Sequence, residues 1–389
     1  MSEKDKSESN SESKNKSHKE ESENNEEEEE EEENEEKKEN KEKKSNKEKQ
    51  SNIEKKSKKS SKSKKENKEN KETNETKEKK ENPESPEVYE KAAEDLKKAM
   101  EGFGTDEEKL ILTVTSHKTQ ERLKIKKIYE EKYNKKLIDD LKSELGGKFE
   151  DAMIALFTEP IEYDADELRK AMKGIGTNED TLIEIIASRP PGILKQIINK
   201  FNEKYKRDLE KDVKSETSGT LRKLLIALLQ CSRSTNTQPN PEQCKAIAEE
   251  MYKAGEAKIG TDESVFNKYF CTLSPIELAQ VSREYHKLTG HTILQAIDKE
   301  FSGDSKKTLR TIVYATLSPS EYFATRIHDA VKGLGTKDQL LIRVLVSRSE
   351  IDMPQIKQYY KQLFGKDMYE DVKNDISGDY RTLMLGIIG

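Results

Sequence analysis

The sequence lacks several features that define large classes of proteins. No run of residues reaches the roughly 18 apolar positions that a bilayer-spanning helix needs. The opening residues, MSEKDKSE, offer no apolar stretch for a secretory signal. Only three cysteines occur in 389 residues, at positions 231, 244 and 271. Three are too few for a disulfide framework, so we expect buried or half-buried thiols and a reducing, cytoplasmic setting.

Histidines are also scarce, and their positions argue against an enzyme. Five are scattered along the chain, at 18, 117, 286, 291 and 328. No Ser/His/Asp, Cys/His or metal–His spacing recurs among them, and lone histidines on helices are usually structural or solvated. We therefore expect no catalytic residues and no enzymatic activity.

Apolar residues are almost absent from the first 85 positions. After Met1, Ile53 is the only aliphatic or aromatic residue before Val88. Such a segment cannot bury enough apolar surface to offset its chain entropy, which predicts a disordered tail over 1–85. Residues 1–40 carry a net charge of −11 and residues 41–80 a net charge of +9. The lysine cluster at 55–65 has no arginine and no interleaved aromatic residue, so we expect a solvated charge run and no nucleic-acid site.

The rest of the chain contains a fourfold repeat. A glycine-bearing turn that ends in Thr occurs at 102–105, 174–177, 258–261 and 333–336. Apolar residues within the repeats recur at helical spacing, as in Leu221, Leu224, Leu225 and Leu228, and no strand-like alternation is present. We predict an all-α fold of four repeats with about five helices each. The expected boundaries are 86–158, 159–230, a polar linker at 231–241, 242–317 and 318–389.

A carboxylate follows each of these threonines at one fixed distance. Adding 39 to positions 105, 177, 261 and 336 gives Glu144, Glu216, Glu300 and Asp375. Four chance matches have a probability of about 0.001 at this acid content. Each Thr is also a suitable helix N-cap, and Thr105 with Glu108 and Thr336 with Gln339 read as capping boxes. An arrangement in which glycines and acids serve only as helix caps remains the alternative, although capping alone does not fix the offset.

The recurring pattern suits a hard cation. Calcium takes six to eight oxygen ligands in tolerant geometry. Glycines let a loop turn its carbonyl oxygens outward, and the paired carboxylate supplies charge. With one acid per site, half of the ion's charge stays uncompensated and coordination positions remain for water. A lipid phosphate could take those positions, so the sequence indicates a calcium bridge between protein and membrane.

These residues resemble a known family. The pattern [M/K]-[K/R]-G-x-G-T, then 38 residues, then Asp or Glu is similar to the annexin type II calcium site. Flanking segments agree, among them YDADELRKAMKGIGTNEDTLIEIIASR at 163–189 and LVSRSEID at 345–352. The resemblance implies a curved disc of four five-helix repeats with its calcium loops on the convex face. It also implies a ligand set of three carbonyls and one carboxylate per site: Met100, Gly102, Gly104 and Glu144; Met172, Gly174, Gly176 and Glu216; Gly255, Lys258, Gly260 and Glu300; Val331, Gly333, Gly335 and Asp375.

This chain departs from the family pattern at three positions. Lys258 stands where glycine is usual, in a loop longer by one residue, so the third site is the weakest match. Glu101 replaces a basic residue and Val331 replaces methionine. The resemblance also places four polar residues in the hydrophilic centre of the disc: Asp164, Glu167, Arg189 and Arg348. These residues could line a path for ions or form a buried salt-bridge network that orients the repeats, and we favour the network.

The function expected from the sequence is calcium-dependent binding to acidic phospholipid such as phosphatidylserine. The protein would be a cytoplasmic monomer that binds the cytoplasmic face of membranes when calcium rises, with lateral assembly possible there. The alternative is a helical-repeat scaffold that binds protein partners through its charged tail.

Overall fold

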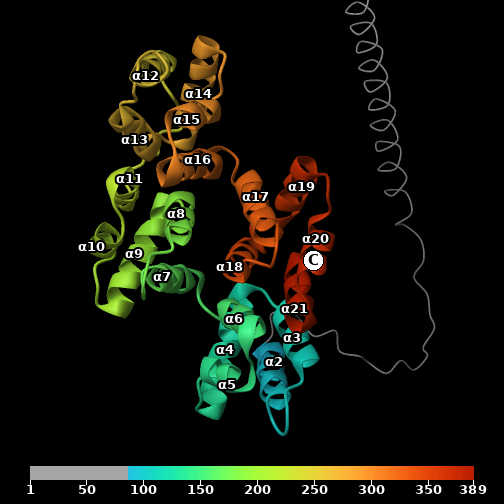
Figure 1. The fold of residues 1–389 in the computed structure, drawn as a ribbon. Coiled ribbons are helices and arrows are strands. Elements are labelled where there is room, and N and C mark those ends of the chain that lie inside the picture. Colours follow the sequence, from blue (N-terminus) through green and yellow to red (C-terminus); the bar gives the residue numbers. More distant parts are fainter. Residues whose placement is uncertain (1–85) are drawn as a thin grey trace, which may run out of the picture. The chain divides into compact units, whose positions relative to one another are not determined.

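The computed structural model describes residues 86–389 of the chain, which fold into helices joined by short loops (Figure 1). Twenty α-helices and no strand occur in this range, so the all-α prediction is confirmed. None of these helices is both long and apolar enough to cross a membrane. The predicted disordered tail over 1–85 lies outside the described residues.

The helices fall into four consecutive sets of five. The first set is α2 (Pro86–Ala99), α3 (Glu107–Thr115), α4 (Thr119–Tyr133), α5 (Leu137–Glu144) and α6 (Gly147–Leu156). The second is α7 (Pro160–Ala171), α8 (Glu179–Ser188), α9 (Pro191–Tyr205), α10 (Leu209–Glu216) and α11 (Gly219–Leu229). The third is α12 (Pro241–Ala254), α13 (Glu263–Thr272), α14 (Pro275–Thr289), α15 (Ile293–Glu300) and α16 (Gly303–Leu317). The fourth is α17 (Pro319–Val331), α18 (Asp338–Arg348), α19 (Met353–Phe364), α20 (Met368–Asp375) and α21 (Gly378–Ile388).

Helix boundaries follow the local chemistry of the sequence. Proline occupies the first turn of α7, α9, α12, α14, α17 and α19, where its missing N–H is no loss. The leucine stripe predicted for the end of the second repeat lies on α11, and all four of its leucines are buried. Its helical spacing therefore marks the face that packs into the protein core.

The apolar side chains form two cores, each built by two repeats. Helices of the first and fourth repeats share one core, where α21 packs on α3 and α6. Helices of the second and third repeats share the other, where α16 packs on α8 and α11. Fully buried aromatic rings lie in both, including Tyr129 and Tyr360 in the first and Phe201 and Phe266 in the second.

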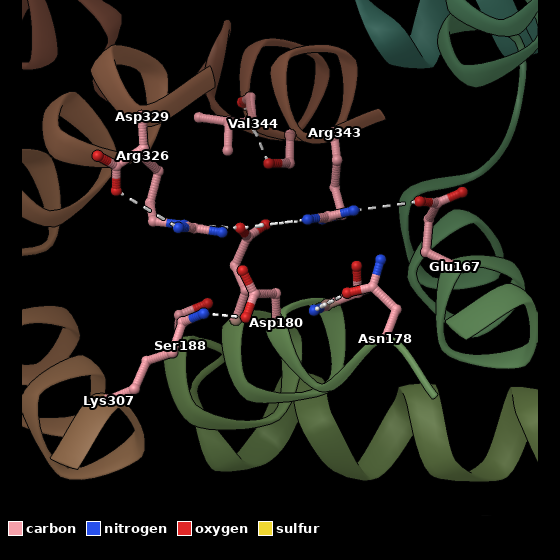
Figure 2. A network of polar contacts seen from close by, with 12 residues as sticks. Glu167, Asn178, Asp180, Ser188, Lys307, Arg326, Asp329, Arg343 and Val344 are labelled. Carbon is pink, nitrogen blue, oxygen red and sulfur yellow. Dashed lines mark hydrogen bonds and ion pairs between the residues drawn. The ribbon is translucent and has the colours of Figure 1, made fainter. Parts of the chain in front are cut away.

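A buried ionic network joins the second repeat to the fourth (Figure 2). Glu184 of α8 accepts hydrogen bonds from Arg326 of α17 at 3.0 Å and from Arg343 of α18 at 2.7 Å. Arg343 also pairs with Glu167 of α7 at 3.3 Å. These side chains are almost wholly buried, and their charges are balanced by one another.

The sequence placed four residues at this centre, and the structure separates them. Glu167 belongs to the network, and Asp164 forms a two-point ion pair with Arg189 at 2.7 and 2.9 Å. Arg348 does not pair with these acids: it binds Asp352, four residues ahead of it, at 2.8 Å. No contact tests whether Arg348 also lines this centre, so that placement stays a prediction. The polar residues have ion-pair partners, as a salt-bridge network requires.

Candidate metal centres

Four loops connect the first and second helices of the repeats, and all close in the same way. We refer to residues 100–105 as loop 1, 172–177 as loop 2, 255–261 as loop 3 and 331–336 as loop 4. The residue after each Thr donates its backbone N–H to the carbonyl of an alanine at the end of the preceding helix. The N···O distances are 2.8 Å for Asp106–Ala99, 2.9 Å for Asn178–Ala171, 2.7 Å for Asp262–Ala254 and 2.8 Å for Lys337–Ala330. Loop 3 spans one more residue than the others.

Glycines give three of the loops a shared backbone shape. In loop 1, Gly102 and Gly104 have φ values of 100° and 90°, a region that side chains with a Cβ rarely adopt. The corresponding glycines of loops 2 and 4 have φ between 81° and 110°. Such a backbone orients successive carbonyls without a side chain in the way. The side chains of Met100 and Met172 are buried, so these residues could offer a cation only their carbonyls.

The 39-residue offset brings each carboxylate to its loop. The threonine hydroxyl donates to the paired acid in all four repeats: Thr105 to Glu144 at 3.5 Å, Thr177 to Glu216 at 2.8 Å, Thr261 to Glu300 at 2.5 Å and Thr336 to Asp375 at 2.5 Å. Each acid is the last residue of the fourth helix of its repeat. The hydrogen bond holds one carboxylate oxygen and leaves the second free to bind a metal ion.

The prediction that these threonines are the helix N-caps was wrong. The N-caps are the next residues, and the side chains of Asp106, Asn178 and Asp262 accept N–H bonds from the first helical turn. Asp and Asn are at least as good at this as Thr. Because the residue after each Thr caps the helix, the Thr hydroxyl is free to donate to the paired carboxylate. This hydrogen bond, which joins the loop to its carboxylate, takes the place of the expected capping box.

Loop 3 differs in its backbone as well as its length. Lys258 does not adopt the positive φ of the glycines it replaces, and its N–H donates to the carbonyl of Gly255 at 3.0 Å. A Cβ on Gly255 would lie 3.3 Å from Cγ of Glu300 and 3.1 Å from the Phe266 ring. The paired carboxylate therefore approaches the loop backbone closely here, while one of the expected carbonyl ligands is already partly engaged.

Loop 3 contains a second acid, which is engaged by side chains outside the loop. Glu256 accepts hydrogen bonds from the Tyr285 hydroxyl at 2.9 Å and from Nδ1 of His291 at 2.8 Å, and it pairs with Lys299 at 3.3 Å. Burial raises the pKa of Glu256, but these partners outweigh it and lower the pKa overall. Glu256 is thus held by side chains of α14, of α15 and of the turn between them.

The donor set of loop 4 surrounds open space. A cavity of about 290 Å³ is lined by three of the four residues expected to bind the ion, Val331, Gly333 and Asp375. The other lining residues are His328, Lys332, Lys366, Asp371 and Asn374. Carbonyl and carboxylate oxygens with room between them suit Ca²⁺, which accepts flexible oxygen coordination. The residues present therefore fit the cation.

One feature of the loops was missed at the sequence level. The residue between the two glycines, or between Lys258 and Gly260 in loop 3, is apolar in every repeat, and its side chain is wholly exposed. Relative exposures are 110% for Phe103, 109% for Ile175, 105% for Ile259 and 108% for Leu334. We call these four residues the apolar tips. The signal was present in the sequence as a large apolar residue at the same position of each turn.

Comparison with known proteins agrees with this geometry. The family model described as Annexin matches four segments, at 91–156, 163–228, 247–312 and 322–387. Annexin A7 of Homo sapiens is 42% identical over 297 residues, which are 76% of this chain and 61% of that protein, so the match spans under two thirds of that relative. Annexin B10 of Drosophila melanogaster is 41% identical over 299 residues, 76% of this chain and 93% of that protein.

Solved structures show the same fold. Annexin III aligns with a TM-score of 0.75 and 40% identity over 77% of this chain and 94% of its own. A calcium-bound annexin (Sm)1 aligns with a TM-score of 0.70 and 31% identity over 77% of this chain and 90% of its own. Four matched repeats, more than 40% identity to curated relatives and this structural agreement identify the chain as a member of the annexins, a family of calcium-dependent phospholipid-binding proteins.

Proposed function

We propose that this protein binds acidic phospholipid membranes through calcium ions held in its four loops. The observation that carries the proposal is the hydrogen bond from each loop threonine to the carboxylate 39 residues later. It brings a carboxylate next to the loop in every repeat. The ligands proposed are the four sets expected from the sequence, and phosphatidylserine is the expected lipid.

The charge balance of each site explains why lipid is needed. A single carboxylate neutralises half the charge of Ca²⁺, and three carbonyls with one carboxylate do not fill six to eight coordination positions. Water completes the shell in solution, and a lipid phosphate supplies both oxygen ligands and negative charge at a membrane. By linkage, lipid tightens calcium binding by the same factor as calcium tightens lipid binding.

Two contacts between repeats support an arrangement of the proposed sites in pairs. Lys307, at the start of α16, pairs with Asp180 at the start of α8, which links the carboxylate side of site 3 to loop 2 (Figure 2). Gln339 after loop 4 donates to Asp151 of α6 at 3.1 Å, which links site 4 to site 1. Sites paired in this way would suit simultaneous contact with one membrane surface.

The apolar tips support a membrane as the partner. A fully exposed Phe, Ile or Leu at a loop end gains roughly 1.5–3 kcal/mol if it becomes fully buried. Each tip lies among the carbonyls that would hold calcium, so a headgroup bound to the ion brings acyl chains toward the tip. If the calcium ions in these loops bound only a soluble anion, four exposed apolar residues would add nothing to the binding.

A variant that lacks all four carboxylates tests the proposal against the scaffold alternative. Glu144→Gln, Glu216→Gln, Glu300→Gln and Asp375→Asn together keep the oxygen ligands but remove the charge. We expect a folded protein that no longer sediments with phosphatidylserine vesicles in calcium. A scaffold that works through its tail would keep its protein partners in this variant, and retained calcium-dependent lipid binding would overturn the proposal.

A further inference from the structure

A cavity of about 340 Å³ lies at the end of the helices opposite the calcium loops. It opens where α8, α11, α13 and α16 end and where α9 and α14 begin. The four ending helices all start beside a loop threonine or its paired carboxylate and are 10 to 15 residues long. At a rise of 1.5 Å per residue, the cavity is about 15 Å or more from the calcium sites. A ligand here and a membrane at the loops would not compete for space.

The lining of this cavity is mainly apolar. Residues of six helices contribute, including Ile186, Ala187, Leu194, Leu228, Pro275 and Ala315. Ile193 and Ile276, the neighbours of lining residues, are 37% and 42% exposed. A concave, mostly apolar space of this volume with a few polar groups is typical of sites for small molecules.

Two arginines line the cavity, and they differ in their charge balance. Arg189 is neutralised by Asp164 through two hydrogen bonds, at 2.7 and 2.9 Å. Arg233 has no carboxylate oxygen within 4.0 Å among residues 86–389. Burial lowers the pKa of Arg233, which shows the cost of holding its charge away from water.

The guanidinium of Arg233 is fixed in place but not saturated. It donates from Nη1 to the Thr316 hydroxyl and from Nη2 to the Phe270 carbonyl, both at 2.8 Å. A guanidinium has five N–H donors, so three remain. The Phe270 carbonyl lies near the end of α13 and offsets part of the charge. A bound carboxylate could still form a two-point contact with the free donors.

The first 85 residues of this chain do not supply a matching occupant. Their aliphatic or aromatic residues after Met1 amount to Ile53 alone. A segment of that composition has almost nothing to place against an apolar lining. We propose that this cavity binds an external amphiphile with one anionic head and a short apolar chain, of the class of medium-chain fatty carboxylates, with its head on Arg233.

Calorimetric titration of the full chain with octanoate, in chelator and without vesicles, tests this site apart from calcium and membrane binding. We expect one octanoate per chain and much weaker binding of 1-octanol, which has the same chain and no charge. Arg233→Gln should weaken octanoate binding roughly 10- to 100-fold, the effect of a lost charged hydrogen bond. Arg283→Gln, a change of the same type at an exposed position of α14, should leave it unchanged.

A second variant decides the matter if Arg233→Gln fails to fold. Gly192 lines the cavity, and a Cβ built on it meets no atom within 4 Å, so Gly192→Phe adds bulk at the cavity rim and keeps the arginine. We expect it to weaken octanoate binding as well. No octanoate binding by the natural chain, equal binding of octanol, or full binding by the folded variants would overturn the proposal.

Discussion

Glu184→Gln removes the carboxylate that joins α8 to α17 and α18. The Glu184 side chain is 1% exposed and receives the guanidiniums of Arg326 and Arg343. Burial raises the pKa of Glu184, but the two arginines outweigh it and bring the pKa from 4.5 to about 2. A fall of that size corresponds to roughly 3 kcal/mol of folding free energy at neutral pH. Breaking buried ion pairs in other proteins costs a similar amount, about 3–5 kcal/mol.

We therefore expect Glu184→Gln to lower the midpoint of thermal unfolding by roughly 5–8 °C at pH 7, measured by far-ultraviolet circular dichroism. The loss should depend on pH. Because the folded pKa is depressed, the stabilisation is complete above the unfolded value near 4.5 and is lost as the pH falls toward 2. The two proteins should converge over that interval.

The control is Glu203→Gln, a change of the same type at an exposed position of α9, which should leave the midpoint almost unchanged. The reasoning fails if Glu184→Gln unfolds at the same temperature as the natural protein at pH 7. It also fails if the difference between the two proteins stays constant down to pH 2.

Three further predictions concern the membrane. Glu144→Gln and Glu216→Gln should raise the calcium concentration needed for vesicle binding more than Glu300→Gln does. The reason is that Lys258 and the engaged Gly255 carbonyl already weaken the third site. A calcium titration with the opposite order would contradict this ranking. Ile175→Ser should reduce vesicle binding at saturating calcium without changing the thermal midpoint, and unchanged binding would remove the tip from the mechanism. A masking model, in which the acidic segment at 1–40 folds back on the lysine-rich stretch at 41–80, predicts that deleting residues 1–40 gives tighter, more salt-sensitive vesicle binding, some of it without calcium, at about 1 kcal/mol per Lys near an anionic surface. The solvated tail that the composition favours predicts unchanged binding at low ionic strength.

The sequence contained most of the candidate sites because their parts recur. The fixed offset from Thr177 to Glu216 and its three counterparts predicted a contact that the structure forms in every repeat. Helical spacing likewise located buried faces such as that of α11. Repetition supplied four independent observations of one geometry.

Features that depend on contacts between repeats could not be found this way. Glu184 lies 142 residues from Arg326 and 159 from Arg343, and no spacing or motif joins them. The pairing of Arg348 with Asp352, an acid one helical turn away, was likewise not predicted. Local hydrogen bonding also decided the helix caps, since Asp106 takes the position expected for Thr105.

Co-sedimentation with phosphatidylserine vesicles over a calcium series tests calcium bridging most directly. We predict that the full chain sediments only when calcium is present, that chelator releases it, and that phosphatidylcholine vesicles bind far less. The loops present oxygen atoms and the chain has a net charge of −6. Without calcium, neither feature attracts the protein strongly to an anionic surface. Equal sedimentation in excess chelator would contradict calcium bridging.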